Sequence, residues 1–139
     1  MSGERYLEIR PGDAAEASAV PVLAPGLFRD VVAAQVTGGA RLAALFGHPV
    51  DNGGMQVMAV MAHQQQGSLL LTAMCPVEDA YQALTPVCPQ AHWFEREIAE
   101  QWGIIPQGHP WLKPIRYHRN WRKDGRDAWG RPADAAIKP

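Results

Sequence analysis

The sequence predicts an α+β domain in which helices pack on a small, mainly antiparallel sheet. Three apolar, strand-like segments at about 41–46, 55–63 and 68–74 follow one another through short turns, which favours an antiparallel meander. Apolar residues recur at helical spacing at about 26–37 and 91–102, before and after these strands. Because each helical pattern gathers its apolar residues on one side, both helices are expected to pack on the sheet.

Three elements are expected before the meander. Residues 6–10 alternate in polarity ahead of a Pro-Gly pair, which predicts a short strand. Residues 13–24 show no clear period and are interpreted as a loop with room for one helical turn. The first helix begins near Pro25, a residue that suits a first helical turn, and ends at the Gly-Gly pair of residues 38–39.

Turn signals separate the three strands of the meander. The first strand is expected to close before Gly47, and the Asp-Asn-Gly-Gly run at 51–54 is a strong turn signal. A glutamine-rich turn at 64–66 precedes the third strand. The methionines of the middle strand are interpreted as core residues rather than metal ligands, because a thioether side chain fills irregular gaps well.

The second helix is the most regular helical signal in the chain. It follows a proline-containing segment, residues 76–90, in which one helical turn is expected around residues 79–83. Arg96 and Glu100 lie one turn apart on the polar side of the helix, where their spacing lets them pair. Gly103 stands where a left-handed C-cap belongs. The apolar stripe of this helix consists of Ala91, Phe94, Ile98 and Trp102.

Charge is distributed unevenly along the 139-residue chain, whose formal net charge is −1. Residues 1–112 hold five Lys/Arg and eleven Asp/Glu, a balance of −6, whereas residues 113–139 hold eight and three, a balance of +5. The length and the 47% of hydrophobic residues suit one modest core. We therefore assign residues 1–118 to one folded domain and residues 119–139 to a basic tail.

No residue pattern indicates a catalytic, cofactor-binding or metal site. Cys75 and Cys88 cannot supply a four-cysteine cluster, and no two of the five histidines have the spacing that puts two imidazoles on one helical face. Neither glycine pair has the context of a phosphate-binding loop. There is no signal-peptide pattern and no apolar stretch of about 20 residues, the length needed to cross a bilayer. The sequence thus predicts a soluble, cytoplasmic chain without a cofactor.

The glutamates of the second helix are interpreted as a charged surface. Glu95 and Glu97 diverge by about 200° around a helix, so they cannot converge on one substrate bond as a catalytic pair of carboxylates does. Together with Glu100, they are expected to face solvent or a partner.

The tail combines basic charge with two of the five tryptophans, Trp121 and Trp129. Because Trp and Arg are enriched at binding hot spots, the tail can dock on a partner; it can also fold back on the acidic body or stay disordered. A basic, aromatic tail also suits single-stranded nucleic acid. Against this alternative, the body is acidic and no fold motif of a nucleic-acid-binding domain is present.

Residues 93–113 resemble the signature of the complex I 30-kDa subunit family. The signature combines a Glu-Arg-Glu triplet, an acidic residue, a bulky-Gly-Ile step, a Gly-His-Pro turn and a basic residue. These fall here on Glu95, Arg96, Glu97, Glu100, Trp102, Gly103, Ile104, Gly108, His109, Pro110 and Lys113. Gln101 departs from the pattern, which usually has an apolar residue there. The ending at 112–118 is similar to the hydrogenase-4 and formate hydrogenlyase branch, in which this domain often precedes a [NiFe]-hydrogenase-like large subunit in one chain.

The resemblance implies a cofactor-free docking subunit of an NADH dehydrogenase- or hydrogenase-type oxidoreductase complex, with no active site of its own. It implies packing against the hydrogenase-like large subunit, peripheral to the inner membrane, with membrane association only through other subunits. The chain is then a separate subunit or a fragment of a fusion. With the two tail tryptophans added, the expected partner-interface residues are Glu95, Arg96, Glu97, Glu100, Gly108, His109, Pro110, Lys113, Trp121 and Trp129.

Overall fold

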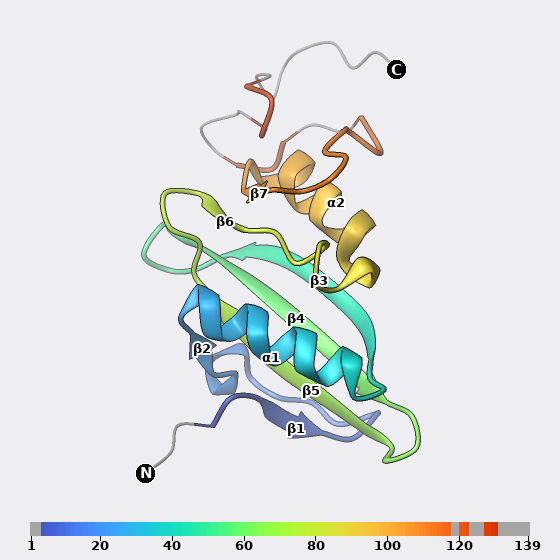
Figure 1. The fold of residues 1–139 in the computed structure, drawn as a ribbon. Helices are drawn as coiled ribbons and strands as arrows, with labels where there is room; N and C mark the ends of the chain where they lie inside the picture. Colours follow the sequence, from blue (N-terminus) through green and yellow to red (C-terminus); the bar gives the residue numbers. More distant parts are fainter. Residues whose placement is uncertain (1–3, 118–119, 123–126, 131–139) are drawn as a thin grey trace.

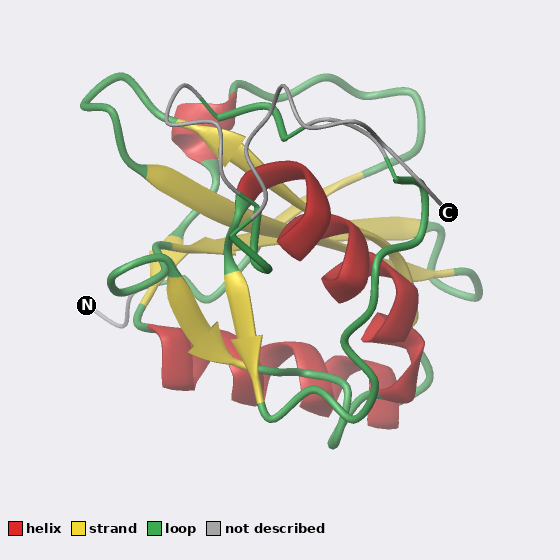
Figure 2. Ribbon diagram, turned by 90° about the horizontal axis from the view of Figure 1, so that it is seen from above, coloured by secondary structure: helices red, strands yellow, loops and turns green. Residues whose placement is uncertain are grey.

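The computed structural model describes residues 4–117, 120–122 and 127–130, and it confirms the α+β class (Figures 1 and 2). The strands of the main sheet are β1 (Leu7–Ile9), β2 (Val22–Leu23), β3 (Arg41–Pro49), β4 (Met55–His63) and β5 (Ser68–Met74). A small parallel sheet pairs β6 (Ala80–Gln82) with β7 (Ile105–Gln107). The helices are α1 (Pro25–Thr37) and α2 (His92–Trp102), with the 3-10 helices η1 (Ala17–Ala19) and η2 (Pro89–Ala91).

The predicted antiparallel meander is confirmed in β3, β4 and β5. β4 pairs with β3 on one side and with β5 on the other, both antiparallel. β1, the short strand expected near residues 6–10, pairs antiparallel with β5 and completes the order β1-β5-β4-β3. β2 lies parallel to β5 and was not expected, because a strand of two residues carries no alternation of polarity.

Both helices pack on the main sheet through one shared core. Phe28 and Val32 of α1, Ile98 of α2 and Met61 of β4 are all buried in it. Figure 1 shows α1 running across β4 and β5, with α2 placed nearer β3. The burial of the β4 methionines confirms their interpretation as core residues.

β3 continues to Pro49, beyond the end that the sequence predicted before Gly47. Gly47 pairs with Val57 of β4 and lies directly under Trp102 of α2. A Cβ atom at residue 47 would come within 2.9 Å of Trp102 Cδ1. Glycine at residue 47 therefore allows α2 to approach β3 closely, and it does not begin a turn.

The prediction of a helical turn around residues 79–83 is wrong. The chain turns at Glu78 and Asp79, whose φ angles of 51° and 58° are left-handed, and then forms β6. β6 is held by β7, and the N–H of Ala83 donates to Gln107 O at 2.8 Å. Because β7 lies more than 20 residues after β6 in the chain, the pairing of the two strands leaves no periodic pattern in the local sequence.

Across the described ranges, no helix is long and apolar enough to cross a membrane.

Candidate interaction site around helix α2

Two glycines turn the chain that follows α2 back along the helix. Gly103 ends α2 with a φ of 70° and donates its N–H to Ala99 O at 3.1 Å, which confirms the predicted left-handed C-cap. Gly108, with a φ of 81°, makes the second turn after β7. The loop that we call the return loop, residues 109–117, can therefore offer its backbone to the charged side chains of α2.

Glu95 is fully buried and holds the segment that follows β6. Its Oε2 accepts hydrogen bonds from the Tyr81 hydroxyl and from the N–H of Leu84, both at 2.8 Å. Its Oε1 accepts from the N–H of Thr85 at 2.9 Å and from the Thr85 hydroxyl at 2.5 Å. Burial, and next the nearby Glu95, raise the pKa of Tyr81 well above its ordinary value, so this phenol stays protonated and donates. Four donors compensate the burial of one carboxyl group.

Arg96 connects α2 to the return loop. Its Nε donates to Lys113 O at 2.8 Å, and its Nη2 donates to Pro114 O at 3.1 Å. The guanidinium carbon lies 5.0 Å from the ring centroids of both Trp93 and Trp111. Planar guanidinium groups favour such contacts with aromatic faces. Two hydrogen bonds and the cation–π contact with Trp111 therefore hold the loop, whereas the contact with Trp93 lies within α2.

Glu97 and Glu100 bind the next stretch of the return loop. Oε2 of Glu100 accepts from the N–H groups of Ile115 at 2.7 Å and Arg116 at 3.0 Å. Glu97 forms an ion pair with the Arg116 side chain at 2.5 Å. The charged side chains of α2 thus reach two backbone segments of the same chain, residues 84–85 and residues 113–116.

These contacts correct the interpretation of the glutamates as an exposed surface. Glu95 and Glu100 are buried, at 0% and 1% exposure, and only Glu97 keeps part of its side chain in solvent. Arg96 and Glu100, which can pair by spacing alone, bind different parts of the return loop instead. The helical period placed these residues away from the apolar stripe, but it could not show that two loops cover that side of the helix.

His109 fixes the turn between Gly108 and Pro110. The N–H of Trp111 donates to His109 Nδ1 at 3.1 Å, so Nε2 carries the proton and donates to His92 O, also at 3.1 Å. The rings of His92 and His109 meet edge to face with centroids 4.8 Å apart. Burial, and next the neighbouring His109 and Arg96, lower the pKa of His92.

The exposed part of this site is aromatic. Trp93 and Trp111, which flank the buried Arg96, are 63% and 54% exposed, and Lys113 Nζ lies 5.1 Å from the Trp111 ring centroid. Among the predicted interface residues, Lys113 and Pro110 share this exposed surface. The sequence prediction omitted both tryptophans, although the spacing of Trp93 and Arg96 on one helical face could have identified the first of them.

Described parts of the tail lie at the C-terminal end of α2. The N–H of Trp121 donates to Gln101 O at 2.7 Å, and the N–H of Ala128 donates to Ala99 O at 3.2 Å. Arg122 forms an ion pair with Asp79 at 2.7 Å. The predicted interface residues Trp121 and Trp129 therefore stand beside the helix end, away from Trp93 at its start. The rest of the tail lies outside the described residues, so its dependence on a partner stays a prediction.

The described His, Cys, Asp and Glu side chains are the candidates for metal ligands and nucleophiles. Within the ranges that the structure describes, no group of three or more His, Cys, Asp or Glu is arranged to hold a metal ion. Cys88 is buried, and this burial raises the pKa of its thiol, which disfavours the nucleophilic thiolate. That the chain binds no cofactor stays a prediction from the sequence.

Comparison with known proteins extends from α1 into the tail. The sequence profile of the family described as respiratory-chain NADH dehydrogenase, 30 Kd subunit, matches residues 28–128. A subunit of the NADH-quinone oxidoreductase of Ruegeria sp. (strain TM1040) is 35% identical over 59 residues, which cover 42% of this chain and 29% of that protein. Formate hydrogenlyase subunit 5 of Escherichia coli (strain K12) is 31% identical over 107 residues, which cover 68% of this chain and 19% of that protein. The chain thus spans less than a third of either relative.

Proposed function

The chain belongs to the family of the 30-kDa subunit of respiratory-chain NADH dehydrogenase, and on this basis we propose that it is a docking subunit of a redox complex. The complex is of NADH dehydrogenase or [NiFe]-hydrogenase type, including the hydrogenase-4 and formate hydrogenlyase branch. The chain carries no cofactor and no active site, packs on the hydrogenase-like large subunit, and sits on the cytoplasmic side of the inner membrane through other subunits. Relatives named as subunits of NADH-quinone oxidoreductase and formate hydrogenlyase support a complex of this kind.

One observation carries the docking role: two exposed tryptophans flank a buried arginine on the family's signature segment. Trp93 and Trp111 keep more than half of their surface in solvent, while Arg96 between them is 6% exposed. Exposed aromatic anchors around a desolvated arginine are typical of residues that dominate binding energy. Their backbone is fixed before binding, because Arg96 already joins α2 to the return loop. A preformed surface loses less conformational entropy when a partner docks.

The signature residues divide into two roles in this proposal. Glu95, Arg96 and Glu100 shape the surface from within by holding the segment after β6 and the return loop. Gly108, His109 and Pro110 set the turn that presents Trp111, and Lys113 contacts the partner directly. Glu97 acts through Arg116, and Trp121 and Trp129 extend the contact along the tail.

The nucleic-acid alternative receives no support from the described contacts. Arg116 and Arg122, two of the basic residues on which that alternative depends, are already engaged by Glu97 and Asp79 of the acidic body. A charge used in this way neutralises fewer phosphates, and phosphate contacts supply most of non-specific affinity.

The test is binding of the full chain to the hydrogenase-like large subunit of the same organism, produced together and measured by biolayer interferometry. Trp93→Ala and Trp111→Ala are each expected to weaken binding roughly 30-fold or more, the effect of losing a hot-spot residue. Val22→Ala, an exposed apolar residue on β2, is the matched control and is expected to leave the affinity unchanged.

The unfolding midpoint of each variant is measured in parallel, so that a loss of binding is not mistaken for a loss of folding. Absence of any complex with the native chain would overturn the docking proposal. Native affinity in the Trp93→Ala/Trp111→Ala double variant would overturn the assignment of the surface while leaving the partner in place.

A further inference from the structure

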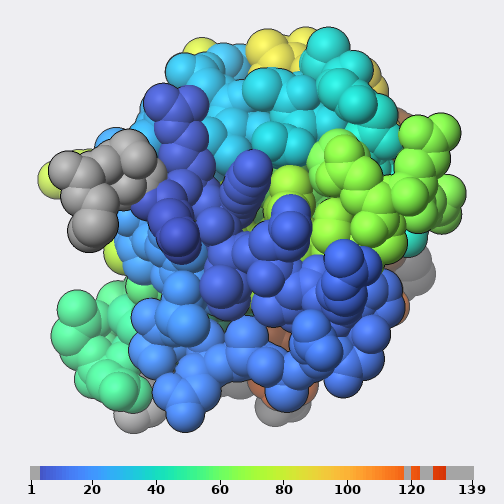
Figure 3. Space-filling model, turned by 90° about the horizontal axis from the view of Figure 1, so that it is seen from below, coloured from blue at the N-terminus to red at the C-terminus, as the bar shows by residue number. Residues whose placement is uncertain are grey.

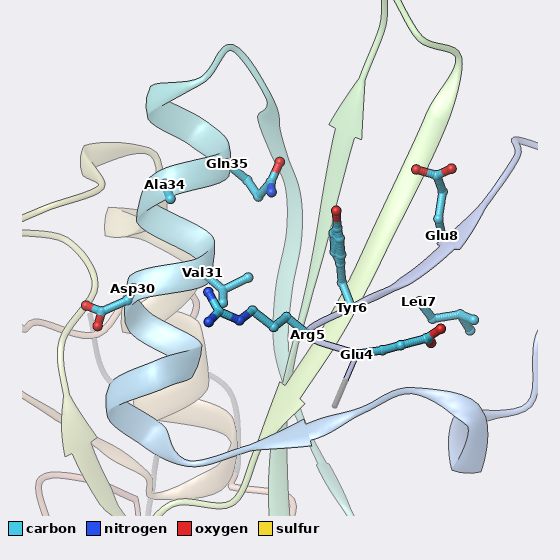
Figure 4. Close-up of a pocket in the computed structure, with 9 residues that line it drawn as sticks. All are labelled: Glu4, Arg5, Tyr6, Leu7, Glu8, Asp30, Val31, Ala34 and Gln35. Atoms are coloured by element: carbon cyan, nitrogen blue, oxygen red, sulfur yellow. The ribbon is translucent and has the colours of Figure 1, made fainter. Parts of the chain in front are cut away.

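A second surface lies away from α2, between the N-terminal strand and α1. A groove of about 860 Å³ separates residues 4–8 from one side of α1 (Figures 3 and 4). In the view from below, the dark-blue N-terminal segment lies beside α1, whose residues are light blue to cyan. The lining residues are Glu4, Arg5, Tyr6, Leu7, Glu8, Asp30, Val31, Ala34 and Gln35.

The groove exists because the helical layer stops short of the sheet edge. β1 is the last strand of the order β1-β5-β4-β3, whereas α1 packs on β4 and β5. The side chains that α1 presents to the groove include the small residues Val31 and Ala34, which do not fill the space in front of β1. Figure 4 shows Tyr6 standing in this space, with Gln35 of α1 reaching toward it.

The lining combines an apolar base with excess negative charge. Glu4, Glu8 and Asp30 place three carboxylates at the rim of the groove, and Arg5, which reaches across toward α1 in Figure 4, is the one cation among these lining residues. Among the described residues, none of the three carboxylates has an ion-pair partner within 4 Å. The hydroxyl of the half-buried Tyr6 has no hydrogen-bond partner there either. The groove therefore offers apolar contact, carboxylates and a hydroxyl to one occupant.

We propose that this groove binds a peptide segment of another protein of the complex, one that carries lysine or arginine beside an apolar residue. The inference rests on the docking role proposed above, because it assumes a multi-subunit assembly. The three carboxylates select a basic segment over an acidic one, since like charges brought together in a confined site repel. Val31, Ala34 and Tyr6 accept the apolar side chain of that segment.

The groove and the exposed surface around Trp93 and Trp111 are built from different elements of the fold. In Figure 1, α2 and the return loop lie in the upper part of the molecule, whereas β1, whose residues line the groove, lies near the bottom. A partner on Trp93 and Trp111 leaves the groove open, so one chain can join two neighbours. Such a bridge suits an assembly subunit without chemistry of its own.

The first experiment is an NMR titration of the full native chain at low ionic strength. The probes are a synthetic hexapeptide of alternating lysine and leucine and a matched peptide with glutamate in place of lysine. Chemical-shift changes with the lysine peptide are expected at residues 4–8 and 30–35, with none from the glutamate peptide. Changes spread over the surface, or equal binding of both peptides, would overturn the proposal.

Charge-matched variants make the titration specific. Glu8→Lys/Asp30→Lys is expected to weaken binding of the lysine peptide by roughly tenfold, as two exposed ion pairs turn into repulsion. Glu16→Lys/Asp51→Lys changes the net charge equally at exposed sites outside the groove and is expected to bind like the native chain. Equal weakening in both variants would show general electrostatic attraction and no groove site.

A photo-crosslinking amino acid in place of Ala34 then tests the assembled complex. Its products are expected to fall on a lysine- or arginine-containing segment of another protein of the complex. Cross-links to an acidic segment, or none in an assembled complex, would overturn the proposal while the docking role stands. Conversely, Trp93→Ala/Trp111→Ala is expected to keep native affinity for the lysine peptide, so failure of the docking role is seen separately.

Discussion

Glu95 accepts both the backbone N–H and the hydroxyl of Thr85 with a single carboxylate oxygen. The other oxygen binds Tyr81 and Leu84, so one side chain satisfies four donors from the segment after β6. All of these groups are buried, and a buried donor that loses its acceptor costs free energy. Glu95, a residue of the family signature, thus has a structural role in this fold.

Glu95→Ala is therefore expected to lower the free energy of unfolding by about 3–5 kcal/mol, the range for breaking a buried, charged hydrogen-bond network. Glu95→Gln keeps the shape but turns one acceptor into a donor facing donors, and a smaller loss is expected. Urea unfolding followed by tryptophan fluorescence measures both. The control is Glu97→Ala, which removes a partly exposed ion pair and is expected to cost at most about 1 kcal/mol. Equal losses in Glu95→Ala and Glu97→Ala would contradict the assignment.

Gly47→Ala is expected to lower the free energy of unfolding by about 1–3 kcal/mol, the usual cost of overpacking a core. The added Cβ would lie 2.9 Å from Trp102 Cδ1, so the indole ring or the helix must shift. Gly26→Ala is the matched control, because nothing lies within 4 Å of a Cβ there and alanine favours helix α1. Native-like stability of Gly47→Ala, with an unchanged Trp102 environment, would contradict the close contact.

The sequence predicted correctly the elements that are determined by local patterns, that is, by short turns and by the periodicity of apolar residues. Short turns linked β3, β4 and β5, and apolar periods marked α1 and α2, so local patterns were sufficient. β6 was missed because its pairing partner, β7, follows only after α2, and left-handed φ angles at Glu78 and Asp79 have no distinctive sequence signal. Gly47 was mistaken for a turn because a glycine required by a neighbouring side chain looks the same in the sequence.

In the candidate site, too, the features set by local sequence were predicted and those set by distant segments were not. The C-cap at Gly103 follows from one residue and its φ requirement, and it was predicted correctly. The burial of Glu95 and Glu100 depends on N–H donors of residues 84–85 and 115–116. The helical period of α2 does not indicate which loops pack against the helix. The exposure of Trp93 and Trp111 likewise depends on where the return loop lies.

Arg96→Lys is expected to loosen the return loop. A lysine cannot donate to Lys113 O and Pro114 O together in the fixed fork of a guanidinium, and it stacks less well between two indole rings. We expect a loss of about 1–2 kcal/mol in the free energy of unfolding and faster amide exchange at residues 111–116. Arg41→Lys, at an exposed position of β3, is the control. Unchanged exchange in the loop would show that Arg96 does not hold it.

Stability is expected to fall as the pH drops below about 6.5, in part through His92. Burial, then His109 and Arg96, lower the pKa of this imidazole in the folded state from its ordinary 6.5, although Glu95 opposes the shift. The unfolded chain then binds more protons between the folded pKa and 6.5, so the free energy of unfolding decreases with falling pH in that window. Urea midpoints at pH 7.5 and pH 5 measure this, and His92→Gln is expected to lose less stability than the native chain. If His92→Gln loses as much stability as the native chain or more between pH 7.5 and pH 5, then protonation of His92 does not destabilise the fold.

Arg122→Ala is expected to release the described part of the tail from the end of α2. Arg122 joins Asp79 in an ion pair and donates to Trp102 O at 3.4 Å, next to the N–H of Trp121 that binds Gln101 O. The Asp79 side chain is 46% exposed, so the variant is expected to change the free energy of unfolding by less than about 1 kcal/mol. The Trp121 and Ala128 amides are expected to exchange faster than those of α2 in the isolated chain, and faster still in Arg122→Ala. Binding of the large subunit is expected to slow both amides. Full protection in the isolated monomer, unchanged by Arg122→Ala, would show that the tail belongs to this domain's own fold and needs no partner.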